Sequence, residues 1–243
     1  MAIAISVAAA YVNNDGGTAV TSGSFNVVTD DLLVVAGHSD EDIGTPVWVI
    51  SDNQTPDLTY TEIARRDDGD GLDGAVIAWY HRIVSNITGL TITLTVTGVN
   101  VDSPAIKVYK ITGYDTTTIL GSVVEGNWTT IGQQTSNITA GTNGIGIVVA
   151  TDWNETGAST SADTTETGFD TTGDISGMSG YRTLVSGNAE NADMTSPSTP
   201  SGNYLWFEVR EASAGGRTTK NIHPWHVGTN QGIGLGLPGG IGS

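Results

Sequence analysis

Hydrophobic and polar residues alternate along much of this chain with the two-residue period of β-strands. The clearest case is LTITLTVTG at 90–98, where Leu90, Ile92, Leu94 and Val96 fall on one side and four threonines on the other. This alternation predicts a strand with one buried face and one face in water. On the same grounds we predict strands at 3–11, 31–38, 46–50, 58–64, 75–84, 90–98, 105–113, 144–152 and 204–211.

The order of these strands indicates the fold class. No segment shows the sustained 3.6-residue apolar period and the capping residues of a helix. The strands follow one another at intervals of about ten residues, which is typical of β-sandwiches. With 243 residues the chain is long enough for a sizeable core. We therefore predict an all-β protein with a jelly-roll-like antiparallel β-sandwich over 1–211.

Two segments lack the strand pattern. Residues 154–180 hold five acidic residues, no basic residue and few large apolar groups, so we expect an exposed acidic excursion from the body. After Ala212 the strand pattern stops and glycine becomes frequent. We interpret 212–243 as an extended Gly-rich C-terminal arm.

Charge separates the body from this arm. The net charge is −17, and residues 1–211 hold all 26 acidic residues against seven basic ones, which gives 7 − 26 = −19. Residues 212–243 hold only Arg217 and Lys220, which gives +2. An acidic body argues against a nucleic-acid partner, because such binding depends on Lys and Arg neutralising phosphates. The basic arm is suited to an acidic surface, either its own body or a neighbouring one.

The ends and the composition bear on the environment of the protein. The chain has no cysteine, so disulfides do not contribute to its stability. The start, MAIAISVAAA, lacks the basic region of a signal peptide, and we expect no cleaved signal. No run approaches the roughly 20 apolar residues of a membrane span, so we expect no membrane partner.

The stretch DDGDGLDG at 67–74 is the most suggestive chemical motif. Asp68, Asp70 and Asp73 are candidate calcium ligands, because calcium prefers carboxylate oxygens. The EF-hand register fails, since its glycine would fall at Asp73 and its glutamate at Trp79. Glycine and aspartate between two strands are also the usual residues of a hairpin turn, which we favour over a metal site.

The histidines and acidic residues form no recognisable catalytic set. HSDED at 38–42 follows a strand and is interpreted as a solvated loop, while His81 is expected to be an ordinary strand residue. HPWH at 223–226 is a metal candidate without acidic or cysteine partners nearby. No nucleophile elbow, phosphate loop or zinc-protease helix is present. We expect no catalysis, no cofactor and no structural metal.

Six tryptophans raise the alternative of sugar binding. Trp48, Trp79 and Trp206 lie within apolar strands and are assigned to the core. Trp128 and Trp153 lie near strand ends and are candidates for exposure, where an aromatic ring stacks on a sugar. A carbohydrate-binding or adhesin module, with a host-surface glycan as ligand, therefore stays open.

Residues 78–122 carry a sequence resemblance. They contain Trp79-Tyr80, then alternating threonines from Thr91 to Thr97, then the run from Val108 to Asp115 with a Thr-rich turn after it. This resembles a pattern of bacteriophage structural proteins and of some secreted bacterial β-sandwich proteins. Lys110 and Ile111 stand where that pattern usually has glutamate and an aromatic residue. The resemblance implies a jelly-roll-like sandwich and a virion component, and it names no active site.

Together these features favour a bacteriophage virion protein on the capsid exterior, most specifically a capsid decoration or cement protein. The expected partners are the major capsid protein and other copies of the chain, in a homo-oligomer. A tail, neck or head-fibre component is the alternative within the virion. The anchors predicted in the arm are its large apolar residues, set between glycines: Trp225, Val227, Ile233, Leu235, Leu237 and Ile241.

Overall fold

The computed structural model divides the chain into two units, Met1–Ser213 and Ala214–Ser243. All the residues that the structure describes lie in the first unit. They are 2–14, 16–41, 46–67, 74–98, 101–130, 133–152, 160–161, 169–170, 176–195 and 202–213.

The described residues form β-strands and no helix, and every strand pair is antiparallel. The first five-stranded sheet has the order β1-β10-β4-β7-β6. Its strands are β1 (Ala4–Asn13), β10 (Val101–Thr112), β4 (Leu32–Glu41), β7 (Ala75–Arg82) and β6 (Thr61–Arg66).

The second five-stranded sheet has the order β11-β19-β13-β16-β15. Its strands are β11 (Leu120–Trp128), β19 (Gly202–Val209), β13 (Ile145–Asp152), β16 (Ser176–Thr183) and β15 (Phe169–Asp170).

Smaller sheets complete the described part. The three-stranded sheet β2-β9-β5 consists of Ala19–Thr21, Ile92–Thr97 and Val47–Asp52. The two-stranded sheets are β3 (Phe25–Val27) with β8 (Ile87–Leu90), β12 (Ile138–Thr139) with β17 (Ala189–Glu190), and β14 (Thr160–Ser161) with β18 (Met194–Thr195).

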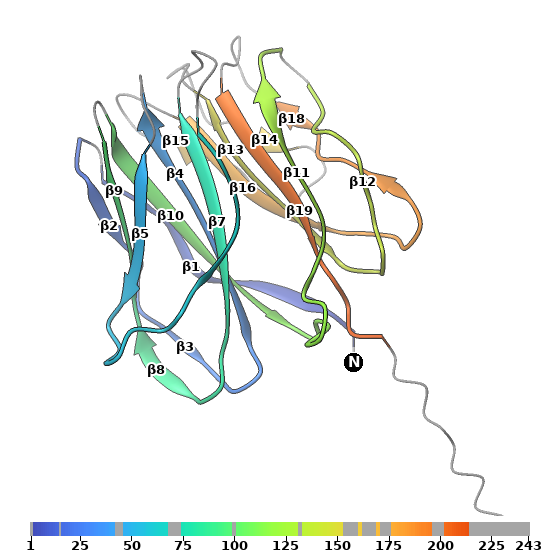
Figure 1. Cartoon of the computed structure of the whole chain (residues 1–243), viewed down its shortest axis with the longest axis horizontal. Helices are drawn as coiled ribbons and strands as arrows, with labels where there is room; N and C mark the ends of the chain where they lie inside the picture. Colours follow the sequence, from blue (N-terminus) through green and yellow to red (C-terminus); the bar gives the residue numbers. More distant parts are fainter. Residues whose placement is uncertain are drawn as a thin grey trace, which may run out of the picture. The chain divides into compact units, whose positions relative to one another are not determined.

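The first five-stranded sheet is covered on both faces. One face packs against β2-β9-β5 and β3-β8 through a cluster that includes Leu33, Val35 and Leu94. The other face packs against the second five-stranded sheet through Leu32, Val34 and Phe207, among others. Figure 1 shows β5 and β9 on one side of β4, β10 and β7, with β11 and β19 on the other side. The sheets therefore stack in more than the two layers of a simple sandwich.

A third cluster covers the outer face of the second sheet. Trp206 and Val148 of that sheet pack there against Ile138, Ala140 and Leu184. Strand β19 is consequently buried along its whole length, as β4 is from Leu32 to Ser39. A strand buried on both faces has a nearly continuous apolar sequence, which explains the runs LLVVA and YLWF.

The predicted all-β class is confirmed, and a strand lies at each of the nine predicted positions. Leu90, Ile92, Leu94 and Val96 are fully buried, as their alternation predicts. Strands β11 and β16 were not predicted, because glycine, serine and asparagine interrupt their apolar pattern.

The prediction for 154–180 was wrong at its C-terminal end. Residues 176–180 open β16, and Gly177 to Gly180 are buried between neighbouring strands. Small side chains suit this position, because a Cβ on Gly177 would stand 2.8 Å from the His38 ring. Residues 160–161 and 169–170 also form short strands, β14 and β15.

Candidate functional site

Several candidate residues lie outside the described part of the chain. They are the predicted arm anchors Trp225, Val227, Ile233, Leu235, Leu237 and Ile241, the calcium candidates Asp68, Asp70 and Asp73, and also Trp153, His223 and His226. The strands on either side of the aspartate stretch, β6 and β7, pair antiparallel, as its interpretation as a hairpin connection requires.

The prediction of a solvated loop at HSDED was wrong for its first residues. Residues 38–41 continue β4, and His38 and Ser39 are fully buried. The reason is the central place of β4, which pairs with β10 on one side and β7 on the other. Burial lowers the pKa of His38 to about 3, so its imidazole is neutral at physiological pH.

A buried lysine that shares the neighbour Tyr11 with this histidine is an unusual polar group of the interior. Lys107 of β10 is 4% exposed, and its Nζ lies 5.4 Å from the ring centroids of both Tyr11 and Tyr109. Its Nζ also donates to the carbonyl oxygen of Ser179 at 3.4 Å. The aromatic faces and the carbonyl oxygen are favourable partners for the end of a lysine side chain at a buried position.

The lysine and its neighbours connect the two five-stranded sheets. Tyr109 Oη and Ser179 Oγ share a hydrogen bond of 2.8 Å between β10 and β16. The Tyr109 ring also meets Tyr181 of β16 edge to face, with centroids 5.7 Å apart. Burial, and then the neighbouring Tyr109, raise the pKa of Tyr11, which stays a neutral phenol.

Burial keeps both His38 and Tyr11 of this cluster in their neutral forms at physiological pH. Sequence reasoning gave Lys107 no role. One signal was available, because Lys107 precedes Tyr109 by two residues and so shares its inward face.

Glu208 is a second fully buried charged group. Its Oε2 accepts the backbone N–H of Gly141 at 3.1 Å, and its Oε1 accepts the N–H and the hydroxyl of Thr142 at 3.1 and 3.2 Å. Both carboxylate oxygens are thus engaged, and they hold the 141–143 turn against β19. The sequence offers no sign of this role, since the partners are 66 and 67 residues apart.

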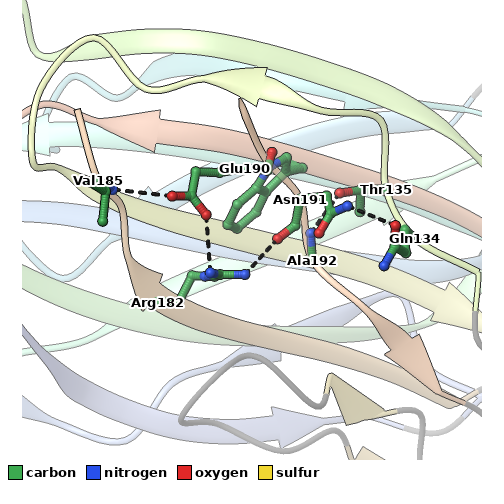
Figure 2. A network of polar contacts seen from close by, with 8 residues as sticks. Gln134, Thr135, Arg182, Val185, Glu190, Asn191 and Ala192 are labelled. Atoms are coloured by element: carbon green, nitrogen blue, oxygen red, sulfur yellow. Dashed lines mark hydrogen bonds and ion pairs between the residues drawn. The ribbon is translucent and has the colours of Figure 1, made fainter. Parts of the chain in front are cut away.

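A third polar network lies over the second sheet, as Figure 2 shows. Arg182 of β16 pairs with Glu190 at 3.0 Å and donates to the Asn191 carbonyl oxygen at 3.0 Å. Glu190 Oε1 also accepts the N–H of Val185, and Asn191 donates to Gln134 Oε1 at 2.9 Å. The network fastens 134–135 and 188–192 over the Trp206 ring, whose Nε1 donates to the Glu190 carbonyl oxygen.

The tryptophans of the described part do not form a sugar platform. Trp128, a candidate for exposure, is fully buried and donates from its Nε1 to the Thr151 carbonyl oxygen. Trp79 and Trp206 are buried as predicted, and Trp48 is half-buried against Trp79. His81 is a half-buried strand residue whose Nδ1 lies 2.7 Å from the Thr59 carbonyl oxygen.

The surface of the described residues is closed, without a cavity or cleft. The same residues contain no group of three or more His, Asp or Glu side chains placed to hold a metal ion. They also contain no helix that would cross a membrane. Large apolar residues are exposed singly at Val28, Val84, Val123 and Val185, whereas two of them, Val47 at 58% and Val49 at 53%, lie on the same strand, β5.

No family model, no curated protein and no solved structure matches this chain.

Proposed function

We propose that this chain is a structural protein of a bacteriophage virion, specifically a decoration or cement protein on the capsid exterior. The observation that carries the proposal is the contrast between a body of net charge −19 and a C-terminal segment of +2 with large apolar residues between glycines. A segment of that kind is suited to lie extended on another surface. The resemblance of residues 78–122 to phage structural proteins points the same way.

The strand order supports a jelly-roll-like description of the first ten strands. If β2 with β3, and β8 with β9, are each counted as one bent strand, the sheet β1-β10-β4-β7 holds the first, eighth, third and sixth strands. The opposing sheet β2-β9-β5 then holds the second, seventh and fourth. A jelly roll built from two Greek keys has these orders. The departure is β6, the fifth strand, which pairs with β7 instead of β5.

The interior polar groups support a role in assembly. Lys107 and Glu208 are engaged in holding sheets and turns together, and no cleft opens among the described residues. Binding therefore falls to the outer surface and to the C-terminal segment. The buried Trp128 removes one of the two tryptophans on which the sugar-binding alternative depended.

The test is to locate the chain on purified virions and to break its predicted attachment. We expect antibodies against the chain to label virion capsids in electron micrographs. Replacing both Leu235 and Leu237 with Asp should abolish co-sedimentation with virions, because two charges would enter an apolar contact unpaired. The matched control is Val84→Asp, at a body position that is 76% exposed, which should bind normally.

The position of the label distinguishes capsid decoration from the alternatives. Label on tails, necks or head fibres would favour that alternative over capsid decoration. Virions without label would contradict the proposal altogether.

A further inference from the structure

Strand β5 has one edge without a partner among the described strands. It pairs only with β9, as the outermost strand of β2-β9-β5. Six residues run in unbroken register from Val47 to Asp52, and none before Asp52 is charged. Such an edge is a template for pairing with another chain.

The other edge strands of the described sheets are irregular or short, which hinders pairing. Register shifts interrupt β1, β6, β11 and the β3-β8 pair. Strand β6 also carries Glu62, Arg65 and Arg66. Strands β2, β12, β14, β15, β17 and β18 are two or three residues long. Among these edges β5 alone is regular over six residues and carries no charged residue before its last one, Asp52.

The edge is free because β6 joins the other sheet. After β5, the chain pairs β6 with β7 instead of returning beside β5. This leaves a row of half-buried apolar side chains along the open side of the core: Trp48, Ile50, Leu58 and Tyr60. A strand added to β5 would cover this row with its inward side chains.

Backbone hydrogen bonds of β9 identify which backbone groups of β5 face the free edge. Asn53 N–H donates to Thr91 O, and Val96 N–H donates to Thr18 O, so odd-numbered residues of β9 face β5 and even-numbered ones face β2. Val49, paired with Thr95, therefore bonds to β9. The N–H and C=O groups of Trp48 and Ile50 point to the free edge.

We propose that this edge of β5 binds residues 232–237, GIGLGL, from the C-terminal segment of a second copy of the chain. In an added strand, Ile233, Leu235 and Leu237 would share one face and cover the apolar row, while the glycines faced outward. The basic segment also matches the acidic body in charge. The inference rests on the proposed function and names the surface that the segment grips.

Geometry favours a second copy over the chain's own segment. The described chain ends beyond β19, where Ala212 N–H donates to Gly113 O. Strand β19 packs on one face of the first five-stranded sheet, and β5 packs on the other. A chain's own segment would have to pass around that sheet. The 18 residues between Ser213 and Gly232 span up to roughly 60 Å when extended, which is long enough to reach a neighbour.

The test uses disulfide trapping, which is clean because the full chain has no cysteine. One chain carries Val49→Cys, and a second carries Gly232→Cys, Gly234→Cys or Gly236→Cys. The side chain at position 49 points outward, as the glycines of the added strand would. Because Val49 bonds to β9, it would form a non-hydrogen-bonded pair with the opposite residue of the added strand, and the Cα atoms of such pairs lie closer together. One of the three glycine positions should therefore cross-link efficiently to position 49 under mild oxidation. Leu235→Cys, on the opposite face, should cross-link poorly. Val84→Cys in place of Val49→Cys is the control for position.

Hydrogen exchange of the chain without introduced cysteines gives an independent measurement. The Trp48 and Ile50 amides should be protected at high protein concentration. Their protection should drop by at least about tenfold when Leu235 and Leu237 are both replaced with Asp. The amide of Val49 should keep its protection, because it bonds to β9 in both cases.

Four results would overturn the inference. The first is no cross-link above the Val84→Cys control, and the second is unchanged hydrogen exchange at Trp48 and Ile50. The third is a dominant Val49→Cys homodimer, which would mean that β5 pairs with β5 of another copy. The fourth is an intramolecular disulfide when Val49→Cys and Gly234→Cys are placed in the same chain. If cross-linking fails while the chain still labels virions, the inference falls and the proposed function stands. If cross-linking succeeds without virion labelling, the proposed function falls.

Discussion

Burial decides the chemistry of the charged and titratable residues that lie between the sheets. His38 is neutral because water does not reach it, and Lys107 keeps its place over two tyrosine rings. Glu208 uses both carboxylate oxygens on one turn. On the surface, the same residue types would contribute little to the free energy of unfolding. The effect of substituting one of them therefore depends on where it lies in the fold.

Glu208→Gln should lower the free energy of unfolding by about 2 kcal/mol. Both oxygens of Glu208 accept hydrogen bonds, whereas a glutamine amide would turn its NH₂ donors toward the N–H of Gly141 or Thr142. Urea denaturation measures the change. Glu125→Gln, at an exposed position on β11, is the matched control and should change stability by less than about 0.5 kcal/mol. Equal effects of the two substitutions would contradict the account of Glu208.

The depressed pKa of His38 predicts acid sensitivity. The native pKa is about 3 and the ordinary value is 6.5, so below pH 6.5 the unfolded chain binds a proton that the native chain does not. Stability from this group is complete above pH 6.5 and is lost between about 6.5 and 3. The loss from pH 7 to 5 should be about 2 kcal/mol.

Denaturation of His38→Gln across this pH range tests the assignment. The variant should show a flatter dependence of unfolding free energy on pH between 7 and 5 than the native chain. If the slope survives in His38→Gln, another group is responsible.

A glycine in the second five-stranded sheet makes room for a large side chain of the neighbouring strand. Trp206 of β19 lies over Gly146 of β13, and a Cβ at that position would collide with the indole and stand 2.8 Å from Leu184. The network of Arg182 and Glu190 holds residues 188–192 over the Trp206 ring. The packing of β13 and β19 therefore depends on the absence of a side chain at Gly146 as much as on the large side chain of Trp206.

Gly146→Ala should destabilise the protein by about 1–3 kcal/mol, because the added methyl group overpacks the core beneath Trp206. The midpoint of thermal or urea unfolding measures this. Gly23→Ala is the matched control, since a Cβ there meets no atom within 4 Å. A neutral Gly146→Ala would show that the indole moves aside freely.

For the whole molecule, the two units Met1–Ser213 and Ala214–Ser243 lead to a prediction about folding. The patterned strands end with β19, and the core clusters are built from residues up to Val209. A chain truncated after Ala212 should therefore melt at nearly the same temperature as the full chain. It should nevertheless fail to attach to virions. A truncated chain that does not fold would show that the C-terminal segment belongs to the body's own core.

Limited proteolysis tests whether the acidic segment is exposed. Because β16 begins at Ser176, the prediction now covers residues 154–175. We expect the first cuts in the free protein to fall within 154–175, where acidic and small residues dominate. Mass spectrometry of the early fragments identifies the sites. First cuts within 177–180 of β16 or within β19 would contradict this expectation, because these residues are buried in the second sheet.

The sequence by itself determined the all-β class and the positions of the long strands. Alternation is a local property, so the inward face of 90–98 was readable without knowing its partners. Short strands such as β12 and β17 carry two residues each and have no such pattern.

Only the tertiary structure decided which strands are covered twice and which edge stays free. The burial of His38 follows from β4 lying between β10 and β7, and the role of Lys107 depends on Ser179, 72 residues away. Trp128 is near a strand end in sequence and yet is buried in space. Likewise β6 pairs with β7 and leaves β5 open. These are pairings between distant segments, and the residue pattern of one strand does not specify its neighbour.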